Sequence, residues 1–227
     1  MKTGCLIINS GYPERQDYVK KIEQFFKGTN IIYKQLDGVF TDQILYDARF
    51  LDDNRPLTRG QIGCALAHVN ALKTAIDMDF DYVYIFEDDV EITNNTSYEL
   101  LQNWLEQLPN HDVCLITNCG TFQGIGHDGR LHKNTHAISA NTHAPANMYT
   151  TCPFGTQSYY ISKNIIKLLY ETQMNMINKN RIFIADGLHI HCEKNPNEYL
   201  TIVTPVNNAT FFKPSPEEKS IIEIVSK

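Results

Sequence analysis

Three adjacent carboxylates end an apolar stretch in the segment YVYIFEDDVEI, residues 82–92. They are Glu87, Asp88 and Asp89, and at about 5 Å and an effective dielectric of about 20 one like-charged pair costs on the order of 3 kcal/mol. A bound divalent cation would offset this repulsion, because hard oxygen ligands suit Mg²⁺ or Mn²⁺. Such a cation would in turn hold a diphosphate. The alternative interpretation is a solvated turn or a pair of helix-capping acids.

Side chains alternate along a strand, so we expect Glu87 and Asp89 on one side and Asp88 on the other. Ligands of open α/β sheets bind outside the carboxyl ends of the strands, where this triplet falls. The pattern therefore predicts a metal site with Glu87 and Asp89 as its carboxylate ligands.

The elements that position the triplet follow from hydrophobic periodicity. Strands are predicted in CLIINS (residues 5–10), NIIYKQLDG (30–38) and YVYIF (82–86). Two helices are predicted between them, with apolar faces formed by Tyr18, Ile22, Phe25 and Phe26 and by Ile62, Leu66, Val69 and Ile76. This order, βαβαβ, is the opening of a nucleotide-binding sheet.

The later chain continues the α/β pattern with one interruption. Ser97 and Ser162 are predicted to cap helices, and strands are predicted in DVCLIT (112–117) and PFGTQSYYIS (153–162). SPEEKSIIEIV (215–225) predicts a short C-terminal helix. The regular pattern fails from Asn118 to Thr150, which exceeds an ordinary loop and predicts a functional loop or a mobile one.

Length, composition and net charge limit the classes of protein to which the chain can belong. With 227 residues, 42% of them hydrophobic, the chain can form one large domain, or one domain plus a lobe, with a proper core. A net charge of -6 argues against a nucleic-acid-binding protein. No apolar run is long enough for a signal peptide or a transmembrane helix, so we expect a cytoplasmic protein. The six cysteines include no CxxC pair and are expected to be reduced, mostly buried thiols.

Several segments together resemble glycosyltransferase family 25, which includes bacterial lipooligosaccharide galactosyltransferases and collagen hydroxylysine galactosyltransferases. The resemblance is carried by LTRGQIGCALAHVNALKTAI (57–76), YVYIFEDDVEI, and FGTQSYYISKNIIKLL (154–169) with Asp186 downstream. IINSGYPERQDYVKKIEQF (7–25) resembles the family's opening strand, loop and arginine. The chain departs from the family at Gln61, where Glu is usual, and at Ala67, where Ser is usual.

The resemblance implies a single α/β domain of the GT-A type over residues 1–227. A Rossmann-like half, about residues 1–117, would bind a UDP-sugar, and an acceptor half would cover about residues 118–227. The family is expected to invert the anomeric centre. By correspondence with the DxD motif, Asp89 would coordinate Mn²⁺ or Mg²⁺, and Asp88 or Glu87 would touch the sugar, the ribose or the metal.

Inverting transfer needs a base that takes the acceptor hydroxyl proton. Asp186, in RIFIADGLHIHC (181–192), follows an apolar strand-like run and is the candidate, although it can also cap the next turn. His189 and His191 share one face if this segment is extended, so either can complete the metal shell or touch the phosphates. Both can equally be structural. His68 is expected to be structural, or to orient a carboxylate.

The remaining candidates fall into a donor group and an acceptor group. Asn9, Ser10 and Arg15 follow the first strand, where a uracil or ribose would lie, and Arg15 can pair a phosphate or be a surface helix charge. Asp37 can accept a ribose hydroxyl or mark a turn, Arg59 lies near a helix N-terminus that favours an anion, and Gln61 can bond a sugar hydroxyl. Acceptor or sugar contacts are expected from Gly155, Thr156 and Gln157.

The function that follows is transfer of a hexose, galactose or glucose, from UDP to a saccharide hydroxyl in lipooligosaccharide or other surface-glycan synthesis. A lipid-linked acceptor would bring the enzyme to a membrane surface. Two alternatives stay open: a nucleotide-sugar hydrolase that uses the same acids, and a catalytically degenerate family member that binds a sugar nucleotide or a protein.

Overall fold

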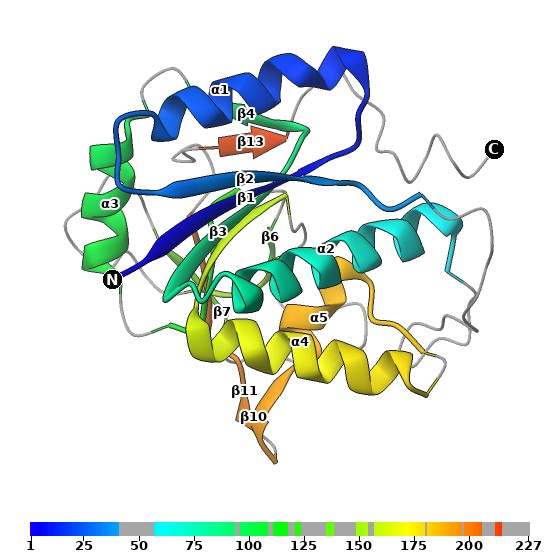
Figure 1. The fold of residues 1–227 in the computed structure, drawn as a ribbon. Coiled ribbons are helices and arrows are strands. Elements are labelled where there is room, and N and C mark those ends of the chain that lie inside the picture. The colour runs from blue at the N-terminus through cyan, green and yellow to red at the C-terminus, as the bar shows by residue number, and fades with distance from the viewer. Residues whose placement is uncertain are drawn as a thin grey trace.

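A nine-stranded sheet runs through the centre of the protein and carries helices on both faces (Figure 1). The computed structural model describes residues 1–40, 57–93, 96–108, 111–117, 121–123, 135–138, 149–153, 157–179, 181–196, 198–205 and 212–214. The expected α/β class is confirmed.

The first half of the chain forms the expected βαβαβ unit. Its strands are β1 (Thr3–Asn9), β2 (Ile32–Asp37) and β3 (Tyr82–Glu87). Its helices are α1 (Gln16–Phe26), which follows the 3-10 turn η1 (Pro13–Arg15), and α2 (Arg59–Asp77). β1 lies between β2 and β3 and is parallel to both, which is a Rossmann-like arrangement.

Five further elements extend this unit: β4 (Val90–Ile92), α3 (Tyr98–Gln107), β5 (Val113–Leu115), β9 (Ser158–Ser162) and α4 (Lys163–Ile177). β9 lies between β3 and β5 and is antiparallel to both. The Ser97 hydroxyl accepts a hydrogen bond from the Leu100 N–H, which confirms the predicted cap of α3. Ser162 occupies the N-cap position of α4 but makes no side-chain capping bond.

The expected loss of regular structure between residues 118 and 150 is wrong in part. This segment contains β6 (Thr121–Gln123), β7 (Thr135–Ile138) and the start of β8 (Tyr149–Pro153). With β12 (Ile202–Pro205) they complete the sheet in the order β2-β1-β3-β9-β5-β12-β7-β8-β6. Strands this short carry too few apolar residues to show alternation. Their backbone pairing with distant strands, which no local pattern encodes, fixes them as strands.

The remaining described elements are α5 (Ala185–His191), the hairpin of β10 (Glu193–Asn195) with β11 (Glu198–Tyr199), and β13 (Phe212–Pro214), which pairs antiparallel with β4. The strand predicted over 153–162 is in fact two, because β8 ends at Pro153 and β9 begins at Ser158. The helix predicted over 215–225 lies outside the described residues.

Strand alternation divides the core between the two faces of the sheet. On one face, α1 and α3 pack against inward side chains of β1 and β3 such as Ile7 and Phe86, and Trp104 of α3 belongs to this core. On the other face, α2 and α4 cover Leu6 and Ile85 (Figure 1). The central strands are therefore buried on both sides, as their continuous apolar sequences predict.

The buried face of α2 differs from the predicted one. Of the predicted residues only Ile62 is fully buried, whereas Leu66, Val69 and Ile76 are half-buried. The deepest positions are held by His68, Leu72 and the alanines at 65, 67, 71 and 75. Small side chains let α2 lie close to the sheet and to α4, so its most buried face is not its most hydrophobic one.

Two expectations from composition can be compared with the described part of the chain. The described cysteine side chains, Cys5, Cys64, Cys114 and Cys192, are not in disulfide bonds, and all but Cys64 are buried. None of the described helices is both long enough and apolar enough to cross a bilayer.

Candidate active site

The carboxyl ends of β1 and β3 lie side by side, with Ile8 opposite Glu87. From β1 the chain crosses to β2 on one side and then returns, through α2, to β3 on the other side. The strand order therefore reverses at the β1–β3 junction, which is where open α/β sheets bind ligands. Asn9, Ser10 and the acidic triplet all lie at this junction.

Asp88 is buried and receives its hydrogen bonds from the loop that follows β1. The Ser10 N–H donates to Asp88 Oδ2 over 2.6 Å, and the Ser10 hydroxyl donates to the same oxygen. Arg15 donates to Asp88 Oδ1 over 2.9 Å, and both side chains are 3% exposed. Gly11 follows Ser10 with a φ of 79°, a left-handed conformation that glycine adopts without strain.

This network gives Asp88 and Arg15 partners within the protein. A buried ion pair depends on such hydrogen bonds to offset its desolvation. The pair ties the end of β3 to the loop after β1. The expected contacts of Asp88 with a sugar and of Arg15 with a phosphate stay predictions.

The carboxylate of Asp89 has one oxygen atom that accepts no hydrogen bond from the described residues. Its Oδ2 lies 3.6 Å from Arg15, whereas its Oδ1 is buried and has no hydrogen-bond partner among the residues that the structure describes. Burial, followed by the charge of Glu87 and opposed by Arg15, raises the pKa of Asp89 to about 7. A cation beside Oδ1 would satisfy this oxygen and counter both the burial and the Glu87 charge. The residues present therefore fit Mg²⁺ or Mn²⁺.

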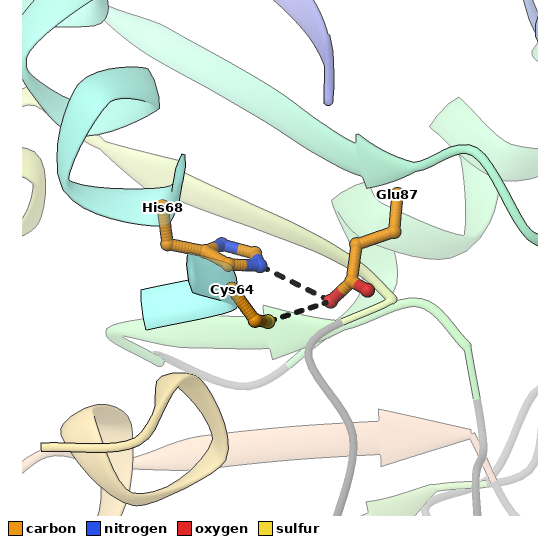
Figure 2. Close-up of side chains that lie close together, drawn as sticks. All are labelled: Cys64, His68 and Glu87. Carbon is orange, nitrogen blue, oxygen red and sulfur yellow. Dashed lines mark hydrogen bonds and ion pairs between the residues drawn. The ribbon is translucent and has the colours of Figure 1, made fainter. Parts of the chain in front are cut away.

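Glu87 faces α2, where it contacts Cys64 and His68. Its Oε1 lies 3.1 Å from His68 Nε2 and 3.9 Å from Cys64 Sγ (Figure 2). Cys64 and His68 are four residues apart on α2 and share a face. On the other side of the ring, His68 Nδ1 lies 2.9 Å from the Tyr159 hydroxyl of β9. His68 therefore orients a carboxylate, as one of the expectations stated, and the Cys-x-x-x-His spacing is the signal that could have identified Cys64.

The expectation that Glu87 and Asp89 point to one side, with Asp88 opposite, is wrong. β3 ends at Glu87, and Asp88 and Asp89 form a turn before β4. Strand alternation therefore does not extend through the triplet. Asp88 and Asp89 share Arg15, while Glu87 bonds to His68.

The N-terminus of α2 is closed by a capping box. The Thr58 hydroxyl accepts from the Gln61 N–H over 3.2 Å, and the Gln61 side-chain oxygen accepts from the Thr58 N–H over 2.9 Å. Glu and Gln both serve at this position of a capping box, so Gln61 can close the box without a carboxylate. Arg59 is exposed in the first turn, near the free N–H groups that would attract an anion.

Asp186, His189 and His191 lie on the helix α5, so the condition under which the two histidines would share a face, an extended segment, is not met. Residues two apart on a helix point about 200° apart, so the shared face that an extended segment would give does not follow here. Ile182 and Ile184, just before α5, pack with Ile62 and Ala65 of α2. The start of α5, where Asp186 stands, therefore lies beside the N-terminal half of α2.

His189 is part of the core. Its ring packs edge-on against Tyr159, with ring centroids 4.6 Å apart. Burial, with a smaller contribution from His68, lowers the pKa of His189 to about 3. The imidazole is therefore neutral at physiological pH. The expected ligation of a metal by His189 or His191 stays a prediction.

The structure also describes three residues predicted to contact the substrates, namely Asn9, Asp37 and Gln157. The Asn9 side chain bonds to Gln16 and Gln35, and Asp37 is exposed at the end of β2. The Gln157 carbonyl accepts from the Glu87 N–H over 2.7 Å, which places this part of the predicted acceptor segment beside the triplet. Gly155 and Thr156 lie outside the described residues.

Two curated proteins are similar in sequence to part of this chain. A relative from Haemophilus influenzae, the lipooligosaccharide biosynthesis protein lex-1, is 29% identical over 140 residues, which cover 61% of this chain and 44% of the relative. Human procollagen galactosyltransferase 2 is 39% identical over 49 residues, 22% of this chain and 8% of that protein. The chain thus spans less than half the length of these two curated relatives.

One solved structure similar to this chain is a glycosyltransferase involved in the glycosylation of the major capsid of PBCV-1. The match has a TM-score of 0.48 at 12% identity and covers 100% of this chain and 99% of the other.

The family comparison covers most of the chain. Residues 13–186 match the model of glycosyltransferase family 25 (LPS biosynthesis protein). The matched region runs from η1 to the start of α5 and includes Arg15, the acidic triplet and the Cys64–His68 pair. The chain therefore belongs to glycosyltransferase family 25.

Proposed function

We propose that the protein is a metal-dependent, inverting glycosyltransferase that moves a hexose, galactose or glucose, from a UDP-sugar to a saccharide hydroxyl. Membership of family 25 supports the transferase class, and the α/β fold with a Rossmann-like first half is consistent with the GT-A type. The names of its relatives favour lipooligosaccharide or other surface-glycan synthesis. The acceptor would then be lipid-linked, and the protein would act in the cytoplasm or at the inner face of a membrane.

The observation that carries the proposal is the buried Oδ1 of Asp89 at the β1–β3 junction, which no residue in the described part of the chain hydrogen-bonds. This junction is the ligand-binding edge of an open α/β sheet. Asp89 and a substrate diphosphate would together hold Mn²⁺ or Mg²⁺, which usually takes one or two carboxylates and completes its shell with phosphates and water. The bound cation supplies electrostatic stabilisation of the leaving diphosphate.

The other residues position the donor and move the proton. Ser10 and Arg15 fix Asp88, and the resulting rigid turn holds Asp89 in place. Asn9, whose amide also bonds to Gln16 and Gln35, and the exposed Asp37 would contact the nucleoside at the ends of β1 and β2, and Arg59 would contact a phosphate. Asp186 would accept the proton of the attacking acceptor hydroxyl.

Release of UDP from UDP-galactose and UDP-glucose, with Mn²⁺ and a panel of saccharide acceptors, tests the proposal. We expect turnover that requires an acceptor and falls by on the order of 100-fold or more in Asp89→Ala. Asp77→Asn, which changes an exposed carboxylate paired with Lys73 on α2, is the matched control and should keep activity. Wild-type turnover no higher than that of Asp89→Ala would refute the transferase. Turnover independent of acceptor would identify a hydrolase instead.

A further inference from the structure

We propose that Cys64, His68 and Glu87 form a Zn²⁺ site that is distinct from the cation site at Asp89. The three ligand atoms lie within 4.8 Å of one another, at the point where α2 crosses the end of β3 (Figure 2). This inference does not depend on the proposed glycosyl transfer, because it rests on the geometry of these three side chains alone.

The spacing of the ligand atoms matches a tetrahedral ion. With a Zn–S bond of about 2.3 Å and Zn–N and Zn–O bonds of about 2.0 Å, tetrahedral angles place S and O about 3.5 Å apart and N and O about 3.3 Å apart. The structure has 3.9 Å between Cys64 Sγ and Glu87 Oε1 and 3.1 Å between His68 Nε2 and Glu87 Oε1. Shifts of a few tenths of an ångström would bring these two pairs to tetrahedral spacing, and the third pair, formed by the ligand atoms of Cys64 and His68, lies within 4.8 Å.

The chemistry of the donors selects the ion. Thiolate and imidazole ligands favour Zn²⁺, whereas Mg²⁺ and Ca²⁺ take oxygen ligands. Asp89 offers carboxylate oxygen to a hard cation, while Cys64 and His68 add sulfur and nitrogen to Glu87. Neighbouring residues of the triplet thus serve ions of different kinds.

A partner outside the ligand set already orients the histidine. Zinc-bound histidines almost always use their second ring nitrogen for a hydrogen bond that fixes the ring. His68 Nδ1 lies 2.9 Å from the Tyr159 hydroxyl, and both residues are buried. With zinc on Nε2, the ring proton resides on Nδ1 and is donated to the tyrosine oxygen.

Protons and charge balance when the ion binds. Without the ion, the Cys64 thiol donates toward the Glu87 carboxylate. Zn²⁺ displaces the thiol proton, which goes to solvent, and the ion with one thiolate and one carboxylate is then neutral. Neutrality suits a half-buried position beside Asp88 and Asp89, and Cys64 and Glu87 are open enough for water to take the fourth position.

Cobalt(II) is the probe, because a thiolate bound to Co²⁺ gives a near-ultraviolet charge-transfer band. We expect one equivalent of Co²⁺ to produce this band in the reduced full-length chain, and Zn²⁺ to abolish it by displacement. Cys64→Ser should remove the band, and His68→Gln should weaken Co²⁺ binding at least tenfold. Cys192→Ser, which changes a buried thiol beside Thr172, is the control that should keep the band.

Two further measurements separate this site from the proposed catalytic site and test it in the wild-type chain. Asp89→Asn should keep the Co²⁺ band even where it abolishes metal-dependent turnover, which separates this site from the proposed catalytic one. In the wild-type chain, Zn²⁺ should protect Cys64 from alkylation, as mapped by mass spectrometry, and this measurement does not require a folded variant. The proposal is overturned if no thiolate band forms, if the band persists in Cys64→Ser, or if Zn²⁺ leaves alkylation of Cys64 unchanged.

Discussion

The guanidinium of Arg15 donates a 2.9 Å hydrogen bond to Asp88, a residue 73 positions further along the chain. Both side chains are 3% exposed, and the same guanidinium lies 3.6 Å from Asp89. One cation from the loop after β1 therefore faces two of the three carboxylates that end β3. The repulsion anticipated for the triplet is offset within the protein for Asp88 and only in part for Asp89.

Loss of Arg15 should destabilise the fold strongly. Arg15→Met leaves Asp88 as a buried charge without its ion pair, and breaking such a pair costs about 3–5 kcal/mol. The free energy of unfolding, measured by urea denaturation, should fall by this amount. Lys20→Met, which breaks an exposed pair with Asp17, is the control and should change it by less than about 1 kcal/mol. The double variant Arg15→Met with Asp88→Asn should be more stable than Arg15→Met alone, and a less stable one would contradict the assignment.

Asp89 should make the metal-free protein less stable as the pH rises. Its pKa is about 7 in the folded protein, against about 4 in the unfolded chain, so the folded state binds more protons between these values. The stability linked to this group is fully present below pH about 4 and is lost as the pH rises through about 7, up to about 4 kcal/mol in total.

Asp89→Asn should remove this loss and be more stable than the wild type at pH 8. Thermal or urea unfolding across pH 4–8 with a chelator present measures the difference, and Asp17→Asn at an exposed position is the control. Parallel pH profiles for wild type and Asp89→Asn would exclude a raised pKa at this position.

His189 should make the protein less stable as the pH falls, which is the opposite of the effect of Asp89. Its pKa is about 3 in the folded protein, against about 6.5 in the unfolded chain, so the unfolded state binds more protons between these values. The stability linked to His189 is present above pH about 6.5 and is lost as the pH falls toward 3. His189→Gln should therefore unfold with a flatter acid limb, whereas the control His111→Gln should follow the wild type. An unchanged acid limb in His189→Gln would show that another group controls acid unfolding.

Gln61 should support α2 through its capping box. Gln61→Leu removes the acceptor for the Thr58 N–H and should cost about 1 kcal/mol, whereas Gln61→Glu should retain the stability. Chemical denaturation checks both, with Asn70→Leu at an exposed position of α2 as the control. Equal stability of Gln61→Leu and the wild type would mean that the box contributes nothing.

Periodicity was sufficient for the elements with strong local patterns. β1, β3 and α1 bury regular apolar positions, so their type follows from the sequence. Their details differ, because β1 is Thr3–Asn9 and α1 buries Val19, Ile22 and Phe26, whereas Tyr18 and Phe25 are half-buried. β7, with the sequence THAI, is a strand because it pairs with β12 and β8, and those contacts are distant in sequence. The buried face of α2 could not be predicted from hydrophobicity, because close packing there favours alanine over larger residues.

The candidate site was predictable in its location and less so in its contacts. The acidic triplet falls at a carboxyl end of the sheet, as the strand before it predicts. The direction of each carboxylate depends on the residue at which β3 ends, and a shift of one residue exchanges the two sides. The segment 185–191 shows the same dependence on element type, because two residues that share a face of a strand do not share one on a helix.

Trp104 is the only tryptophan of the chain, and it is 6% exposed in the core between the sheet and α3. The intrinsic fluorophore therefore lies in the core on the sheet face opposite α2 and α4. Its emission reports directly when that layer becomes hydrated, without any label or added dye. Combined with the Co²⁺ band at the α2 face, it allows loss of each side of the sheet to be timed separately during unfolding.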